Sequence, residues 1–278
     1  MVQMTEYLTQ QEAAGALRAT RLEEVERLLP QQLRDLLAAQ LGRLTTQERA
    51  ILEAASVAGV EFTVASMAAG EAVPEETVET VCEQLVARGQ FIAERGLETW
   101  ADGTVSGRYG FRHALYQEVL YQGLSASRRA RLHRRIGERQ EAGYGKRAPE
   151  IAAELALHFA QGHEFHRAVA YLQKAADTAL QRNAYAEAIG LLTRALELLQ
   201  TWPDTVARDH QELTLQLALG ESLMMHQGYS APEAERAYTR ALTLCQVDTP
   251  SQLRFNVLTG LASLWIARGN FRRARELA

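Results

Sequence analysis

The feature that most constrains the fold of this chain is a repeated helical pattern over residues 148–278. Apolar and small residues recur there at helical spacing, and glycine or asparagine stands where one helical segment gives way to the next. Small residues let two helices approach closely, while large residues fill the space between neighbouring pairs. A single pair of this kind cannot bury its apolar face alone, so the pattern predicts helical hairpins that stack into an extended array.

Three stretches carry the pattern most clearly, and their spacing is similar to that of the tetratricopeptide repeat. The last stretch comprises Leu258, Leu261, Ala262, Trp265, Gly269, Phe271 and Ala274. An upstream copy, with asparagine at the turn, comprises Leu172, Ala175, Ala176, Ala179, Asn183, Tyr185, Ala188, Leu192 and Ala195. Between them, two extra turn residues allow a third match at Gly220, Leu223, Gly228, Ala234, Tyr238 and Ala241. The copies are irregularly spaced, and an unrelated helical bundle is the alternative.

A further pair of helices is expected in front of these copies, at Glu150–Gln161 and Phe165–Gln181. We therefore assign residues 148–278 to tetratricopeptide-like repeats. The Gly143-Tyr144-Gly145 segment interrupts the helical pattern and is the expected flexible boundary before this array.

The N-terminal half shows a different pattern, in which helices precede a β-hairpin. Thr45-Thr46-Gln47-Glu48 forms a capping box at the start of one helix, and shorter helices are predicted at Thr63–Ala69 and Glu75–Arg88. Leu97–Trp100 and Arg108–Phe111 then flank an Asp-Gly turn, which favours a tight hairpin. Three helices followed by a hairpin form a winged helix.

The winged helix is predicted from Gln31 to Phe111, and the helices His113–Gln122 and Ser125–Ala142 complete a segment over residues 31–142. The predicted fold class is therefore mainly α: a winged-helix domain with one small β-hairpin, followed by an α-solenoid of tetratricopeptide-like helical hairpins.

Composition and charge exclude several classes of protein. Hydrophobic residues make up 47% of the chain and charged residues 23%, values typical of soluble globular proteins. A formal net charge of -4 provides no global attraction to nucleic acid or to an anionic membrane. No run approaches the roughly 20 apolar residues that span a bilayer. Cys82 and Cys245 lie in apolar helical patterns, as in a reducing compartment, so we predict a cytoplasmic protein with no membrane partner.

No segment carries a complete catalytic or metal-binding motif. Gly143-Tyr144-Gly145-Lys146-Arg147 lacks the first glycine and the final serine or threonine of a phosphate loop. Gly220-Glu221-Ser222-Leu223-Met224 lies inside a repeat helix and cannot form the strained turn of a nucleophile elbow. His158, His163 and His166 have no matching cysteine or carboxylate, so surface or capping roles are expected. We expect no enzyme activity, no metal and no cofactor in this chain.

The most concentrated charge lies on one predicted helix, with Leu132 and Ile136 as its buried stripe. The candidates for contact with the phosphates of a nucleotide or of DNA are Arg128, Arg129, Arg131 and Arg135. A solvated helix face is the alternative. A winged helix that reads DNA needs basic and amide residues on its recognition helix, whereas Glu75-Glu76-Thr77-Val78-Glu79 would repel the duplex, so DNA is a disfavoured partner.

Two segments of the N-terminal half carry distinctive sequences. Gln31–Val60 contains Leu33-Arg34-Asp35-Leu36-Leu37-Ala38-Ala39-Gln40-Leu41-Gly42-Arg43-Leu44 and Ala54-Ala55-Ser56-Val57-Ala58-Gly59. The other, followed by the Arg-rich helix, is Phe111-Arg112-His113-Ala114-Leu115-Tyr116-Gln117-Glu118-Val119-Leu120-Tyr121. Both resemble the region after the core in bacterial signal-transducing ATPases of the STAND/AAA type with tetratricopeptide tails. Such proteins are often fused to adenylate or guanylate cyclase, kinase or LuxR-type domains, and the resemblance covers nearly the whole chain.

The resemblance implies a switch in which nucleotide state controls oligomerisation and the repeats sense a partner. By position, His113, next to Arg112, is similar to the histidine that related ATPases place against the β-phosphate of ADP, a contact that a helix N-terminus favours. The alternative is that His113 only caps its helix. Residues 1–30 resemble the terminal helix of an ATPase core, but the phosphate loop and the acidic metal-binding motif of such a core are absent from the chain. At the other end, Ala278 falls within a repeat helix. We therefore expect that the chain is truncated at both ends.

The predicted function is a non-catalytic regulatory and protein-interaction segment of such an ATPase. Its expected partners are a protein or peptide on the repeats, an ATPase core in cis that alone supplies ATP or ADP binding, and further copies in a nucleotide-dependent homo-oligomer. The alternative is a DNA-binding transcription regulator that uses the winged helix and the Arg-rich helix.

Overall fold

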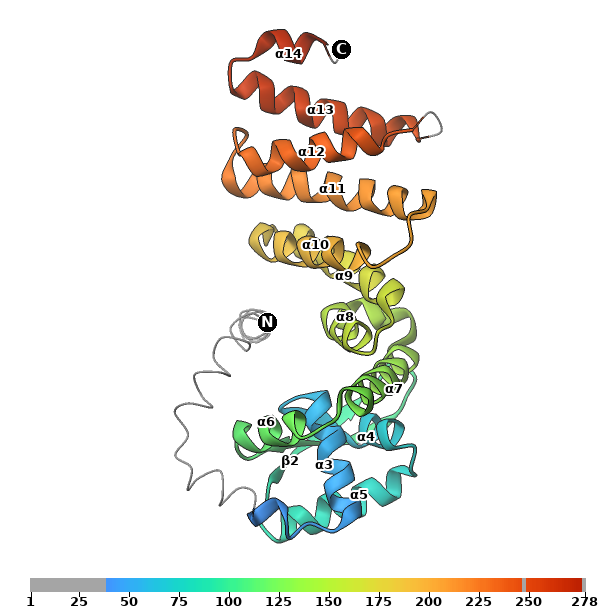
Figure 1. The fold of residues 1–278 in the computed structure, drawn as a ribbon. Helices are drawn as coiled ribbons and strands as arrows, with labels where there is room; N and C mark the ends of the chain where they lie inside the picture. Colours follow the sequence, from blue (N-terminus) through green and yellow to red (C-terminus); the bar gives the residue numbers. More distant parts are fainter. Residues whose placement is uncertain (1–38, 247–248, 277–278) are drawn as a thin grey trace. The chain divides into compact units, whose positions relative to one another are not determined.

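A computed structural model describes residues 39–246 and 249–276 of the chain (Figure 1). They form two units, and the chain passes between them more than once. The N-terminal unit extends to Glu98 and resumes at Ser106–Ser125, while the C-terminal unit comprises Thr99–Val105 and the chain from Ala126 onward. The helix predicted within residues 1–30, and the start of the predicted winged-helix segment, lie outside the described residues.

The N-terminal unit has the element order of a winged helix, which confirms this part of the predicted fold. Its elements are α3 (Thr46–Ala58), β1 (Glu61–Thr63), α4 (Val64–Glu71), α5 (Glu75–Ala87), β2 (Ile92–Thr99), β3 (Val105–Phe111) and α6 (Ala114–Gln122). The predicted capping box starts α3: Glu48 N donates to Thr45 Oγ1 at 3.2 Å, and Thr45 N donates to Glu48 Oε2 at 2.8 Å.

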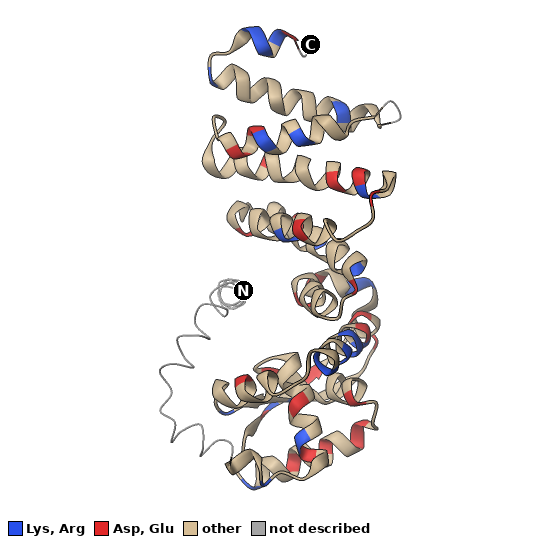
Figure 2. Cartoon of the chain, viewed as in Figure 1, with Lys and Arg blue, Asp and Glu red and all other residues tan. Residues whose placement is uncertain are grey.

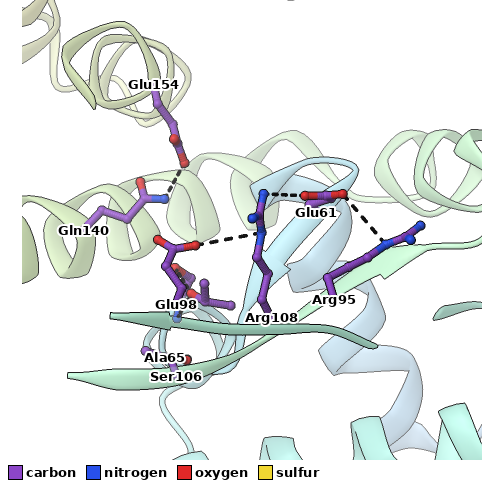
Figure 3. A network of polar contacts seen from close by, with 10 residues as sticks. Glu61, Ala65, Arg95, Glu98, Ser106, Arg108, Gln140 and Glu154 are labelled. Atoms are coloured by element: carbon purple, nitrogen blue, oxygen red, sulfur yellow. Dashed lines mark hydrogen bonds and ion pairs between the residues drawn. The ribbon is translucent and has the colours of Figure 1, made fainter. Parts of the chain in front are cut away.

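The three strands form one sheet in the order β1-β3-β2, with β1 antiparallel to β3. Strand β1 was not predicted, because three residues are too few to show an alternating pattern. Glu61 on β1 forms ion pairs with Arg108 on β3 and with Arg95 on β2, the latter at 3.8 Å (Figure 3). The Ser106 hydroxyl accepts a buried hydrogen bond from Ala65 N at 2.9 Å and so ties the start of α4 to β3.

The C-terminal unit is helical throughout its described length, apart from the hairpin tip. Its elements are α7 (Ala126–Tyr144), the 3-10 helix η1 (Gly145–Ile151), α8 (Ala152–Gln161), α9 (Phe165–Gln181), α10 (Tyr185–Leu199), α11 (Val206–Gln227), α12 (Pro232–Leu244), α13 (Ser251–Ala267) and α14 (Phe271–Glu276). In Figure 1 successive helices from α8 onward lie against one another as a stack of hairpins, which confirms the predicted array.

One turn geometry recurs between the helices of this stack. His163, Asn183 and Gly269 each adopt a positive φ, between 58° and 72°, one position before the next helix cap. In all three turns the following amide reaches back five residues to a helix carbonyl, at 2.8–2.9 Å. This bond closes the Schellman motif, in which a left-handed residue ends the helix, and it explains why asparagine can replace glycine at the predicted turn.

The structure differs from the expected boundary at Gly143-Tyr144-Gly145. Helix α7 continues to Tyr144 and is followed directly by η1, so no flexible linker separates the basic helix from the array. Leu132 and Ile136 are buried as predicted, and α7 packs against α8. Helix α7 therefore belongs to the C-terminal unit, whereas the predicted segment 31–142 placed it with the winged helix.

Candidate functional site

A cavity with a volume of about 300 Å³ lies on the helical array. Helix α9 supplies one wall from a single helical face, the loop after α10 supplies Trp202, and α11 supplies Gln211. The residues on the α9 wall are His166, Val169, Ala170, Gln173, Lys174 and Asp177. These positions recur at intervals of three and four residues, as one stripe along a helix must. We call this cavity the array groove.

The array groove contains one contact between aromatic rings and several polar side chains. The His166 ring lies over Trp202, with ring centroids 3.7 Å apart and planes inclined by 32°. Gln211 Nε2 donates to Gln173 Oε1 at 2.8 Å and so bridges α11 and α9. The Lys174 ammonium lies 4.6 Å from the Tyr171 ring centroid. Burial raises the pKa of Asp177 above its ordinary value.

The bridging glutamine pair gives the array groove a specific hydrogen-bonding capacity. Each glutamine carries one carbonyl acceptor and two N–H donors. The bond between them uses the Gln173 carbonyl oxygen and one N–H of Gln211, which leaves the Gln173 amide donors and the Gln211 carbonyl oxygen. A donor beside an acceptor complements the C=O and N–H of a peptide unit, and Ala170 and Trp202 add an apolar surface for a side chain.

Of the residues that line this groove, sequence reasoning singled out His166, which was expected to be a surface or capping residue and is exposed. It did not point to the others. Trp202 lies in a loop between hairpins, and Gln211 precedes the part of α11 that matched the repeat pattern. Their proximity to α9 depends on tertiary packing. The exposed polar stripe on α9 was the one available signal, and a solvated helix face gives the same pattern.

Arg112 and His113 lie together at the start of α6, and both are exposed. His113 occupies the position before the first helical residue, with φ −141° and ψ 129°, and its side chain makes no capping hydrogen bond. Arg112 is anchored to the winged helix, because its backbone amide donates to Phe91 O at 2.8 Å and its Nε to Ile92 O at 3.0 Å. The geometry thus presents the His113 ring at a helix N-terminus, next to a positioned arginine.

Basic positions colour the ribbon of α7 blue in Figure 2. The four candidate phosphate contacts on this helix differ in exposure. Arg131 is exposed, whereas Arg128, Arg129 and Arg135 are half-buried and engaged in contacts. The opposite charge dominates the exposed face of α5, where Glu76, Glu79 and Glu83 project to solvent. These α5 carboxylates would repel the phosphates of a duplex.

His158 is not the surface or capping residue that the sequence predicted. Its side chain is 1% exposed, and its Nδ1 lies 3.0 Å from Nδ1 of His133, which is 2% exposed. His158 lies next to Phe159 on the face of α8 that packs against α7, so helical periodicity places it in the core. Within the described part of the chain, no group of three or more histidine, cysteine or acidic side chains is arranged to hold a metal ion.

Among the described helices, none is both long enough and apolar enough to cross a bilayer.

Comparison with curated proteins shows a similarity to a longer bacterial protein. The chain is 28% identical over 218 residues to an uncharacterized protein of Rhizobium meliloti (strain 1021). The match covers 76% of this chain and 20% of that protein, so the chain spans about a fifth of the length of its relative. No protein-family profile and no solved structure matches the chain.

Proposed function

We propose that this chain is a non-catalytic regulatory and protein-interaction segment of a cytoplasmic signal-transducing ATPase of the STAND/AAA type. In this proposal the tetratricopeptide-like array binds an extended segment of a partner protein in the array groove. The observation that carries it is the Gln173–Gln211 bridge, which sets a hydrogen-bond donor and acceptor beside the apolar surface of Trp202. Concave helical arrays commonly bind proteins by such surfaces.

The winged helix supplies the second part of the proposed function. It couples the array to an ATPase core in cis, which binds ATP or ADP and controls assembly into homo-oligomers. Arg112 and His113 would face the nucleotide of that core, because a helix N-terminus and a ring N–H both favour an anion. The match to a fifth of a much longer relative supports a role within a larger protein. The acidic exposed face of α5 favours this role over DNA binding.

Selection of peptides on the full chain tests the array groove. A displayed library of random 12-residue peptides should yield binders, and fluorescence anisotropy should give dissociation constants for the labelled peptides. Replacing Gln211 with alanine should weaken binding about 10-fold, because losing a hydrogen bond to a peptide unit costs roughly 1 to 1.5 kcal/mol.

Gln252→Ala is the matched control, because Gln252 also forms a bond between side-chain amides, to Asn256 at 2.9 Å, but lies on α13. Its affinity for the same peptides should be unchanged. Failure of the library to enrich any peptide, or equal binding by the Gln211→Ala variant and the unaltered chain, would contradict groove recognition.

The link to an ATPase is tested separately on the full-length Rhizobium meliloti relative. Fluorescent ATP and ADP analogues should bind it and be displaced by unlabelled nucleotide. A full-length relative without nucleotide binding would overturn the ATPase part of the proposal and leave the peptide-binding part to its own test.

A further inference from the structure

The tip of the β2–β3 hairpin, residues 99–105, belongs to the C-terminal unit, although the strands on either side belong mainly to the N-terminal unit. Trp100 on this tip is only 3% exposed, although the next three residues are all exposed. A tryptophan at the end of a projecting wing would expose most of its large apolar ring, and removing that ring from water is strongly favourable.

The surface that covers Trp100 is the C-terminal end of α7. A Cβ at Gly143 would lie 2.2 Å from a Trp100 ring carbon, so the ring rests where only glycine leaves room. The Arg139 guanidinium lies 4.5 Å from the ring centroid, in cation–π contact, and the Tyr144 ring lies at 5.9 Å. The glycine that looked like a flexible break is therefore a packing site for the tip.

Three hydrogen bonds hold the tip in the same place. Arg139 Nη1 donates to Asp102 Oδ2 at 3.2 Å, and Arg139 Nη2 donates to Thr104 Oγ1 at 2.8 Å. Asp102 N donates to Gly143 O at 2.9 Å. Because α7 ends at Tyr144, the Gly143 carbonyl is one of those that a helix end leaves without an intrahelical partner, and the tip satisfies it.

The attachment of the tip is small compared with the packing of α7 itself. Helix α7 buries a longitudinal stripe that includes Leu132, Ile136 and Gly137, whereas the tip buries one large side chain, that of Trp100. Segments with few buried apolar contacts open at lower free energy than the core around them. On this ground the tip is expected to open at a lower free energy than α7.

We propose that residues 99–105 form a releasable latch on the C-terminal end of α7. When the latch is closed, the chain crosses from one unit to the other at three peptide links. These links are Glu98–Thr99, Val105–Ser106 and Ser125–Ala126. When it is open, the tip leaves the C-terminal unit and only the link at Ser125–Ala126 remains. The assignment of this latch as the coupling element of the switch rests on the proposed function.

Residue-resolved hydrogen exchange on the full chain tests the latch, with the Asp102 amide as the reporter of the closed state. In the unaltered chain this amide should exchange by local opening, at a rate insensitive to low urea and faster than core amides of α9. Gly143→Ala should accelerate its exchange at least about 10-fold, because the new methyl displaces Trp100. Gly190→Ala on α10, where no atom lies within 4 Å of an added Cβ, should leave it unchanged.

Two results would overturn the latch. In one, the Asp102 amide of the unaltered chain exchanges with the same free energy and urea dependence as α9, which makes the tip a fixed part of the unit. In the other, neither Gly143→Ala nor Arg139→Gln accelerates its exchange. Circular dichroism shows whether Gly143→Ala folds. If it does not fold, the exchange of the Asp102 amide in Arg139→Gln decides the test. Peptide binding by the array groove, measured on the same samples, separates failure of the latch from failure of the proposed function.

Discussion

Replacing Gly260 with alanine should destabilise the last described hairpins by about 3 kcal/mol, the upper end of the usual cost of overpacking a core. Gly260 on α13 and Gly220 on α11 lie against opposite edges of the Tyr238 ring, which α12 contributes and which is 1% exposed. A Cβ at Gly260 would lie 2.2 Å from Tyr238 Cε1, and one at Gly220 would lie 2.7 Å from Cε2. The ring therefore cannot move away from one helix without meeting the other.

Urea unfolding followed by circular dichroism measures this loss. Gly190→Ala is the matched control, since it also replaces a helical glycine but meets no neighbouring atom. It should stabilise the chain by up to about 1 kcal/mol, which is the helix propensity of alanine over glycine. A Gly260→Ala variant that unfolds at the urea concentration of the control would refute the packing argument.

A double-mutant cycle shows whether Tyr238 is the cause. Tyr238→Leu alone should be destabilising, because it leaves a cavity between the two glycines. In that background Gly260→Ala should cost much less than in the unaltered chain, because the ring edge that it meets is gone. If the losses of stability of the two single variants simply add in the double variant, the Tyr238 ring is not what Gly260→Ala clashes with.

Much of the fold could be predicted because its signals are local. The left-handed turn at Asn183 and the capping box at Thr45 each depend on residues that are neighbours in sequence. Strand β1 and the fit of Gly143 against Trp100 depend on pairing across the fold, and neither has a periodic signature. A glycine beside a tyrosine and a second glycine resembles a flexible linker until its neighbour in space is known.

Less of the candidate site than of the fold could be predicted from the sequence, because most of its contacts join residues that are far apart in the chain. Arg112 and His113 could be singled out because they are adjacent in sequence and open a helix. The bond from Gln211 to Gln173 joins residues 38 positions apart, and the His133–His158 contact joins residues 25 positions apart. Each of these side chains alone looks like an ordinary polar residue on a helix.

The buried His133–His158 pair predicts that the C-terminal unit loses stability as the pH falls below about 6.5. Two neutral imidazoles can share the 3.0 Å contact, with one Nδ1–H donating to the other Nδ1, whereas protonating the acceptor sets two N–H groups against each other. Burial lowers the pKa of His158 to about 4. Burial, the neighbouring imidazole and Arg129 hold the pKa of His133 well below its ordinary value.

The direction of the effect follows from proton linkage. In the unfolded chain both histidines take up protons near pH 6.5, whereas in the folded chain they stay neutral until the pH approaches 4 or lower. The unfolded state therefore binds more protons between these values, and stability falls as the pH is lowered. At about 1.4 kcal/mol per pH unit for each imidazole, the loss at pH 5 should be roughly 2 to 4 kcal/mol for the pair.

Urea unfolding at pH 7.5, 6.5, 5.5 and 5.0 checks this expectation with two variants. His133→Gln combined with His158→Gln should be less stable at pH 7.5 but should lose most of the pH dependence over this range. His210→Gln removes an exposed histidine on α11 and should keep the full slope. Most carboxyl groups titrate below this range, so they add little to the slope. An equal slope in the double variant and the unaltered chain would show that the buried pair does not control acid stability.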